Sequence, residues 1–453
     1  MRIKQVILKL FLLLIVSSCI HKTQEVTTKI RGKIVNPKTD KVLISRDFLM
    51  LTADTLKLKY ENKIYGEVKT PREGLYFIYI FPEFQTIYLK PGDSLAFHIN
   101  VDEFDESLSF SGSIGFENNL LLELYLENEK ESAYFYDHQF NFDAKTFLKK
   151  IDSFTAINKK LINSYQKELE KSDKKYREII ALYHNSLQYS LKEAYLKKHP
   201  DESIEKEYVN YCQTLHNPLP DPNIIYMYAF ADNYIERKLQ KNKDKNIETF
   251  LKIAQTIEKE IYDKEFKDNL LIKYCLRYIK SQKIFEKDST ISYYLSVIQN
   301  DTYKNYCKKL INKNKQIKNG KLFPNISVRN KQNKLYKLNE FLKDQKTLIS
   351  FWNLDNRKNF ISNLEKLEKI KEKHPELQII ILNLNPQSQE EWMLQVPVNS
   401  KFMYLQLTRE EDVHTVSPYH LAQIFLIDSL QIKNSLQNMY TTDFEKKLEE
   451  FMQ

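Results

Sequence analysis

The stretch Thr347-Leu-Ile-Ser-Phe-Trp352, followed by Asn353-Leu-Asp-Asn-Arg-Lys-Asn359, decides the fold of the C-terminal part of this chain. The first six residues are mostly apolar, which predicts a strand buried in a sheet, and the next seven are mostly polar. Apolar residues then recur at helical spacing, at Phe360, Leu364, Leu367 and Ile370. A buried strand followed by an amphipathic helix predicts one half of an α/β crossover.

Further strands surround this unit. Strand patterns cover 335–338, 378–384 and 424–428, and a second helical face closes the chain at Phe444, Leu448 and Phe451. Alternation of strands and helices predicts an α/β sheet with at least one parallel crossover over residues 321–453.

This order of elements resembles the thioredoxin-like fold, and specifically the membrane-anchored thiol-disulfide oxidoreductases called TlpA-like. Phe323-Pro324, Phe351-Trp352 and Phe425-Leu-Ile-Asp428 carry the resemblance. In that family the Phe-Trp pair is followed, after three residues, by Cys-x-x-Cys at the start of a helix. Counting from Trp352 places Asn356 and Asn359 at the two cysteine positions.

The family's chemistry requires a thiolate, whose formation is favoured when a helix N-terminus lowers the cysteine pKa. The asparagine amides offer no such nucleophile, but Asn356, like Asp355, is a favourable helix N-cap. Asp355, Arg357 and Lys358 could hold a ligand, although a solvated charged loop is the simpler interpretation. The sequence thus predicts a helix start where the resemblance implies a redox site.

A second departure concerns the loop before the strand at 424–428. The resemblance implies a cis-proline at the position of Ala422, where it would face the active site. A cis bond before a residue other than proline costs about 2.5–4 kcal/mol, so we expect a trans bond at Ala422. Because both the nucleophile and this proline are missing, we expect a redox-inactive domain.

The N-terminal region predicts β-structure over residues 26–115. Apolar and polar residues alternate around Ile30 and Ile34, and Pro91-Gly92 suits the centre of a type II turn. We expect an antiparallel β-sandwich or barrel. The stretch Tyr88-Leu-Lys-Pro-Gly-Asp-Ser-Leu95, with Phe110-Ser-Gly112 and Asn118-Asn119, resembles the N-terminal β-domain of many lipoproteins from the Bacteroidetes group.

Residues 116–320 predict helices and a linker. Helical faces are expected at Leu148, Ile151, Phe154, Ile157, Leu161, Tyr165 and Leu169, at Ile180, Tyr183, Leu187, Leu191 and Tyr195, and at Leu271, Tyr274 and Tyr278. Breaks are expected at His199-Pro200 and between Pro218 and Pro222. The many tyrosines could line a ligand groove, although packing residues are the commoner role.

The first residues predict export. Arg2 and Lys4 precede an apolar run too short to span a membrane, and small residues lead to Cys19. Val16-Ser-Ser-Cys19 resembles the lipobox of bacterial lipoproteins, which implies a signal peptide over 1–18, acylation of Cys19 and a tether over 19–25. We expect a body held at a bacterial membrane of the cell envelope, in the periplasm or at the cell surface. An ordinary secretion signal is the alternative.

Composition excludes several function classes. The formal charge of +9 falls to about +6 once Arg2, Lys4 and Lys9 are removed, without a basic stripe, so nucleic-acid binding is not expected. Besides Cys19, the chain has Cys212, Cys275 and Cys307, with no C-x-x-C, so at most one pair can form a disulfide. Neither a metal nor another cofactor is predicted.

The sequence therefore predicts a multi-domain α+β envelope lipoprotein whose redox-inactive thioredoxin-like domain binds or scaffolds an envelope protein or peptide. Two alternatives stay open. One is a thiol-disulfide oxidoreductase that uses a cysteine outside the motif, and the other is a glycan- or lipid-binding protein that uses the tyrosine-rich helices.

Overall fold

The computed structural model describes residues 26–201, 212–240, 247–281, 288–317, 319–352, 357–386, 392–394, 396, 401–417, 424–436, 439–440 and 443–453. Two compact units divide the chain, one of Met1–Asp244 with Thr256–Asn269 and one of Lys245–Gln255 with Leu270–Gln453. No helix within the described ranges is both long enough and apolar enough to span a bilayer.

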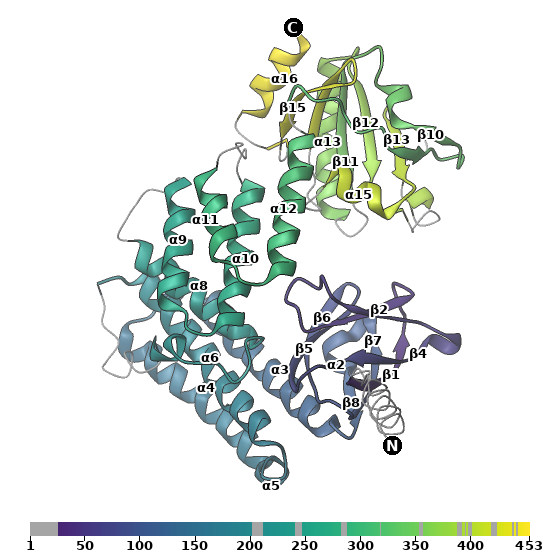
Figure 1. The fold of residues 1–453 in the computed structure, drawn as a ribbon. Helices are drawn as coiled ribbons and strands as arrows, with labels where there is room; N and C mark the ends of the chain where they lie inside the picture. The colour runs from purple at the N-terminus through teal and green to yellow at the C-terminus, as the bar shows by residue number, and fades with distance from the viewer. Residues whose placement is uncertain are drawn as a thin grey trace, which may run out of the picture. The chain divides into compact units, whose positions relative to one another are not determined.

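The N-terminal region of the first unit is β-structure, as predicted (Figure 1). Its strands are β1 (Thr27–Val35), β2 (Lys41–Ser45), β3 (Asp54–Lys57), β4 (Lys63–Lys69), β5 (Gly74–Ile80), β6 (Glu83–Leu89), β7 (Ser94–Asn100) and β8 (Ser109–Gly112). They form two four-stranded sheets, in the orders β4-β1-β7-β8 and β3-β2-β5-β6.

The expectation of a wholly antiparallel β-domain is wrong in one respect, because β1 pairs with β7 in parallel. Alternation along β1 identifies its buried face, but two strands so far apart in sequence can pair in either direction. The turn before β7 is as predicted. Gly92 has a φ of +84°, and the Asp93 N–H donates to the Lys90 carbonyl at 3.2 Å.

Helices follow from α3 to α12, as predicted. After the short α2 (Phe104–Ser107), they are α3 (Gly115–Asp137), α4 (Ala144–Ser164), α5 (Gln166–Leu169), α6 (Lys174–Lys198), α8 (Ile225–Gln240), α9 (Ile247–Glu260), α10 (Lys264–Ser281), α11 (Ser289–Val297) and α12 (Asp301–Gln316). Helix α6 ends just before His199-Pro200, and α8 begins after the prolines at 218–222, so both expected breaks are present.

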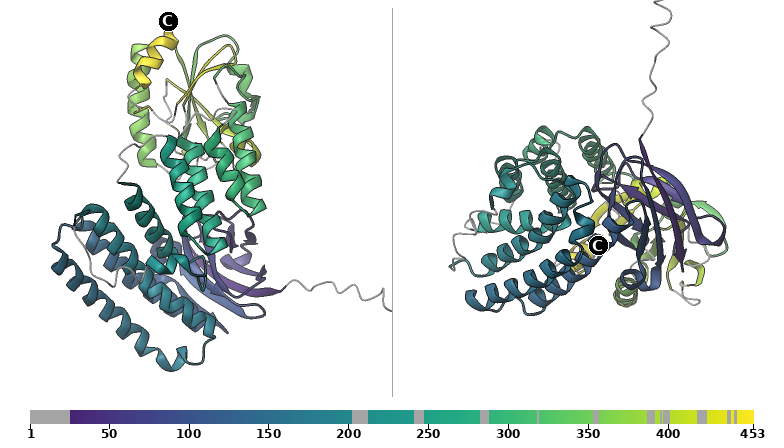
Figure 2. Two further views of the ribbon diagram at one scale, coloured as in Figure 1. Left: turned by 60° about the vertical axis from the view of Figure 1, so that its left-hand side comes forward. Right: turned by 90° about the horizontal axis from the view of Figure 1, so that it is seen from below.

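The long blue helices of the first unit lie side by side in both views of Figure 2, and α3 packs against α4 and α6. The predicted face of α6 is buried as expected. The predicted face of α4 is partly wrong, because Ile157 is 49% exposed and its neighbour Asn158 is buried. The Asn158 amide donates to Asn128 Oδ1 on α3 at 3.0 Å, which explains why a polar residue occupies this position.

The loop rich in proline is fixed to the β-structure of the same unit. The fully buried Asp221 carboxylate accepts from Arg46 Nη2 at 3.1 Å and from the Leu75 N–H at 3.1 Å. Gly74 has a φ of +148°, and a Cβ there would meet Asp221 Oδ2 at 2.1 Å. Glycine is therefore required where β5 meets this carboxylate.

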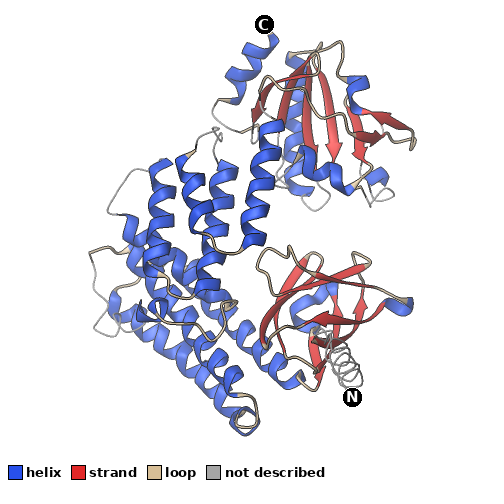
Figure 3. Cartoon of the chain, in the orientation of Figure 1, coloured by secondary structure: helices blue, strands red, loops and turns tan. Residues whose placement is uncertain are grey.

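The last part of the second unit is a seven-stranded sheet in the order β10-β9-β13-β12-β11-β14-β15 (red arrows in Figure 3). Its elements are β9 (Ser327–Arg329), β10 (Leu335–Lys337), β11 (Thr347–Trp352), α13 (Arg357–Lys373), β12 (Gln378–Asn383), β13 (Met403–Leu407), α15 (Glu410–Val416), β14 (Ile424–Asp428), β15 (Gln431–Leu436) and α16 (Phe444–Met452).

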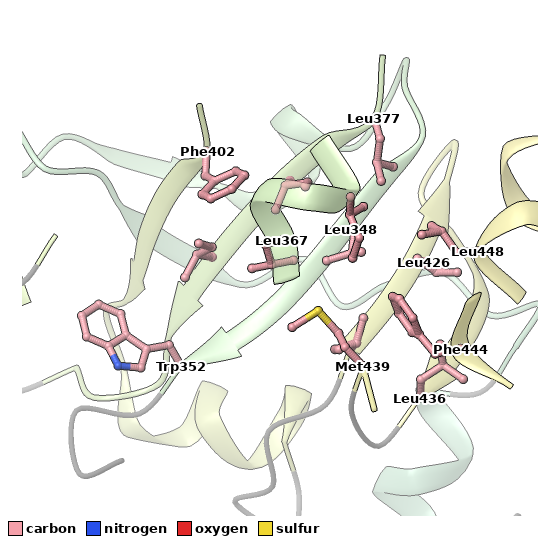
Figure 4. Close-up of a cluster of buried hydrophobic side chains, with 14 of the residues drawn as sticks. Leu348, Trp352, Leu367, Leu377, Phe402, Leu426, Leu436, Met439, Phe444 and Leu448 are labelled. Atoms are coloured by element: carbon pink, nitrogen blue, oxygen red, sulfur yellow. The ribbon is translucent and has the colours of Figure 1, made fainter. Parts of the chain in front are cut away.

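This topology is α/β with parallel crossovers, as predicted. Strand β11 is parallel to β12 and antiparallel to β14, and β14 pairs with β15 in antiparallel fashion. One face of the sheet packs against α13 and α16 through Leu367, Ile370, Phe444 and Leu448 (Figure 4). The other face packs against α15 through Val413 and Val416. The arrangement agrees with the expected thioredoxin-like fold.

Candidate functional site

Strand β11 ends at the candidate residue Trp352, which therefore lies at the edge of the sheet formed by the carboxyl ends of the parallel strands. All six of its residues are buried, because β11 lies between β12 and β14 and both faces of the sheet are covered. Trp352 is its last residue, and its indole lies at one end of the apolar cluster (Figure 4). Trp352 is therefore part of the core at the place where β11 ends.

Helix α13 begins at Arg357, so Arg357, Lys358 and Asn359 lie in its first turn. The predicted helix start after Asn356 agrees with this boundary. Asp355 and Asn356 lie outside the described residues, and so does Ala422. Their capping role and the trans bond at Ala422 stay predictions.

Strand register brings four residues into one row across this edge. Trp352 pairs with Asn383, Asn383 pairs with Gln406, and Gln406 pairs with Arg329. Paired residues of adjacent strands project to the same face of a sheet, so these side chains lie next to one another across β11, β12, β13 and β9. We call Trp352, Asn383, Gln406 and Arg329 the edge row.

Three members of the edge row hold the backbone that follows β12. Asn383 Oδ1 accepts from the Asn385 N–H at 2.6 Å, and Gln406 Nε2 donates to the Asn385 carbonyl at 2.5 Å. Arg329 Nη2 donates to the Pro386 carbonyl at 2.6 Å. These contacts fix residues 385–386 at the edge of the sheet.

Two polar atoms of the edge row remain without a hydrogen bond within the described part of the chain. They are Asn383 Nδ2, a donor, and Gln406 Oε1, an acceptor, and both side chains are 0% exposed. Leaving a buried donor or acceptor without a partner costs about 1–3 kcal/mol. The edge therefore holds one donor and one acceptor suited to a group that carries both, such as an amide.

Sequence reasoning missed Asn383, Gln406 and Arg329. A signal was present, because Asn383 ends the apolar run Gln378-Ile-Ile-Ile-Leu-Asn383, and a polar residue at the end of a buried strand is a candidate for such an edge. Gln406 gave less warning, because β13 was not predicted as a strand.

A groove of about 410 Å³ lies between α13 and α16. Its charged side chains are largely paired: Lys366 bonds Glu445 at 3.1 Å, and Lys373 contacts Glu449. His374 Nε2 lies 3.4 Å from the same Glu449 carboxylate. Side chains of both charges thus line the groove, with the lysines Lys366, Lys369 and Lys373 beside the carboxylates of Glu365 and Glu445.

The three described cysteines are in helical surroundings, and two of them, Cys212 and Cys275, have thiols whose pKa is raised. Burial and the nearby Glu193 carboxylate, 3.8 Å from the sulfur, raise the pKa of Cys212 to about 12. The hydrogen bond from Cys307, together with burial, raises the pKa of Cys275 well above its usual value. A thiolate nucleophile needs a lowered pKa, so this geometry disfavours thiol catalysis by Cys212 or Cys275.

Many tyrosines of the helical region pack their rings inside the protein. Several of the tyrosines expected on helical faces are less than 2% exposed, namely Tyr183, Tyr195, Tyr274 and Tyr278, as are Tyr176 and Tyr294. Buried rings cannot line an open groove, so these residues act as packing residues. No cluster of potential metal ligands occurs among the described residues.

Comparison with known proteins adds neighbours of the fold. No protein-family model matches the chain, and no curated protein matches it. Among solved structures, the C-terminal domain of a proposed thiol-disulfide oxidoreductase from Bacteroides thetaiotaomicron is 18% identical, with 30% of this chain and 97% of that chain covered and a TM-score of 0.26.

Two other solved structures give similar values. A thiol:disulfide interchange protein from Bacteroides sp. is 21% identical, with 30% of this chain and 91% of that chain covered and a TM-score of 0.25. A thiol peroxidase from Chromobacterium violaceum is 18% identical, with 30% and 85% covered and a TM-score of 0.26. Because these scores are low, the assignment of the fold rests on the strand order and crossovers of the sheet itself.

Proposed function

We propose that the C-terminal domain is a redox-inactive protein-binding module that holds an extended peptide segment of an envelope protein at the edge row. The observation that carries the proposal is the pair of buried amides, Asn383 and Gln406, that keep one free donor and one free acceptor at this edge. Residues 321–453 contain no cysteine at all, so this domain supplies no thiol nucleophile of its own.

The position and chemistry of the edge row support peptide binding. Ligands of open α/β sheets bind outside the carboxyl ends of the strands, where β11 and β12 place Trp352 and Asn383. A peptide group offers one N–H and one carbonyl, which complement Gln406 Oε1 and Asn383 Nδ2. Both side chains are 0% exposed, so the edge of the sheet must open before a peptide can reach these atoms, and binding would then relieve the cost of leaving them unpaired.

Two exposed apolar side chains in the same domain support contact with a protein rather than a small polar molecule. Met393 is 44% exposed and Leu394 is 88% exposed. They adjoin Trp392, which is fully buried in the same apolar cluster as Trp352. An apolar side chain of a partner would bury Met393 and Leu394.

We also propose that the protein is held at a bacterial membrane by acyl chains on Cys19, with its body in the periplasm or at the cell surface. The N-terminal sequence supports this placement, because more than one acyl chain gives durable attachment. Labelled palmitate in the purified chain, lost in Cys19→Ala, is the expected result. Equal labelling of both proteins would contradict the anchor.

The binding function can be tested by site-specific photo-crosslinking in intact cells. A photoreactive residue at Leu394 should capture one defined partner, and the same residue at the exposed Lys433 on β15 should not. Asn383→Leu with Gln406→Leu should abolish the Leu394 product while the protein level stays unchanged. Equal capture from Leu394 and Lys433, or capture that survives both substitutions, would reject the edge row as the binding site.

Redox inactivity needs its own measurement. The purified full chain should reduce a model disulfide such as insulin no faster than free dithiothreitol alone. Catalysed reduction that disappears after alkylation of Cys212, Cys275 and Cys307 would show a thiol enzyme instead. The buried positions of the latter two argue for the inactive outcome.

A further inference from the structure

Two cysteines meet between helices α10 and α12 of the second unit. Cys307 Sγ lies 3.6 Å from Cys275 Sγ, and both residues are 0% exposed. Thirty-two positions separate them in sequence. A disulfide has an S–S distance of about 2.05 Å, so the sulfurs need to approach by only about 1.5 Å.

The surroundings hold the two thiols in place. Leu271 and Ile279, one turn to either side of Cys275, are buried, and so are Tyr303 and Leu310 around Cys307. Both cysteines therefore face the packed interior between their helices, where side chains have little freedom to move apart. Their closeness follows from helix packing and not from a flexible surface loop.

We propose that Cys275 and Cys307 are joined by a disulfide bond in the exported protein. This inference rests on the proposed export of the chain, because disulfides form and persist in oxidising compartments. The assignment also accounts for the odd number of cysteines after Cys19. Cys212 hydrogen-bonds the Glu193 carboxylate in the first unit and stays a free thiol.

The bond forms by exchange with an external disulfide, either a small one such as oxidised glutathione or that of an oxidising enzyme. One cysteine, as its thiolate, attacks the external disulfide, forms a mixed disulfide and releases one thiol. The second cysteine then attacks the sulfur of the first and releases the other thiol. The two cysteines lose two electrons and two protons, and the external disulfide gains them as two thiols.

Because both sulfurs are buried, the exchange takes place while the chain folds, before α10 and α12 close over them. The finished bond is then inaccessible to reductants in the folded protein. It connects α12, the helix that precedes the C-terminal sheet, to α10. Separation of these two helices is thereby prevented.

Differential alkylation of the full chain, expressed with its own leader in a bacterial host, tests the proposal. Free thiols are blocked with N-ethylmaleimide during denaturing lysis, and disulfides are then reduced and labelled with iodoacetamide. Mass spectrometry should find iodoacetamide on Cys275 and Cys307 and N-ethylmaleimide on Cys212. N-ethylmaleimide on all three would overturn the disulfide.

Cysteine variants and refolding of the purified protein provide two further tests of the bond. The refolding test does not depend on the redox conditions of the host. Cys212→Ala should keep the iodoacetamide label on the pair, whereas Cys275→Ala should move Cys307 to the N-ethylmaleimide group. Wild-type protein refolded in a glutathione redox buffer should be 2 Da lighter than after reduction. An unchanged mass after refolding would exclude the bond even if a cysteine variant failed to fold.

Discussion

At the scale of single residues, the clearest feature of the first unit is a group of buried polar side chains between α3, α4 and α6. Glu131 is fully buried, and neither of its carboxylate oxygens has a hydrogen bond within the described part of the chain. Burial raises its pKa to about 8. His184 on α6 is also buried, and burial together with the charge of Lys159 lowers its pKa to about 4.

Glu131 should make the protein less stable as pH rises. The folded protein keeps the Glu131 proton up to a pH of about 8, whereas the unfolded chain loses it near 4.5, so unfolding becomes easier across this interval. The slope is about 1.4 kcal/mol per pH unit. Glu131→Gln should remove this loss, so that the variant exceeds wild type in urea unfolding at pH 8 but not at pH 4.5. Glu127→Gln on the same helix is the control and should follow wild type.

His184 should act in the opposite direction. The unfolded chain takes up a proton near pH 6.5, but buried His184 in the folded protein resists protonation down to about 4, so stability falls as pH drops through this range. His184→Gln should flatten the acid side of the stability curve, measured by urea unfolding between pH 4 and 7. If His98→Gln on the exposed face of β7 gave the same flattening, burial of His184 would not be the cause.

At the scale of elements, the Asp221 contact joins the loop before α8 to β5. Asp221 also orders its own loop by accepting the Asn223 N–H at 2.9 Å. The Arg46 side chain that it binds is only 12% exposed, and Glu265 is a second, longer partner at 3.6 Å. Loss of Asp221 would leave most of a buried guanidinium charge uncompensated.

Asp221→Ala should therefore destabilise the first unit by about 3–5 kcal/mol. Asp173→Ala, which removes the exposed pair with Lys90, should cost no more than about 1 kcal/mol. Chemical denaturation of the three proteins followed by circular dichroism gives both values. If the two substitutions lowered the free energy of unfolding by similar amounts, the buried ion pair would contribute no more to stability than the exposed one.

Elements that bury a regular apolar pattern could be predicted from sequence, and short or polar ones could not. The ranges of β11 and β14 match the prediction, because both are continuous apolar runs. β9, with three residues, and β15, with alternating polar residues, were missed because their pairing partners define them. The edge row was missed for the same reason, since Asn383, Gln406 and Arg329 become neighbours only through the register of four strands.

At the scale of the whole molecule, the chain forms two compact units whose boundaries do not follow single breaks in sequence. Residues 245–255 group with the second unit and 256–269 with the first, so α9 and α10 each contribute to both. No composition change marks these crossings, because amphipathic helices look alike whichever neighbour they pack against. The Cys275–Cys307 pair lies wholly within the second unit.

Reduction should consequently destabilise the second unit alone. A disulfide that closes a loop of this length stabilises by about 3–4 kcal/mol in the chain-entropy account. Hydrogen exchange should be measured on the oxidised full chain and on a chain that was reduced in denaturant and refolded under reducing conditions. The reduced chain should show faster exchange in α10 and α12, with α3 and α6 unchanged. Uniform acceleration across both units, or none in α12, would contradict this assignment.

The pairing of β1 has a mechanical consequence. Strand β1 begins two residues after the expected tether, and it lies between β4 and β7 with seven register pairs on either side. A pull along the tether is directed along the axis of β1, so the hydrogen bonds of both ladders resist in shear and share the load. If the chain is anchored to a membrane by its first residues, a force on the rest of the protein would therefore load the first sheet in shear. In that direction the hydrogen bonds of both ladders resist together.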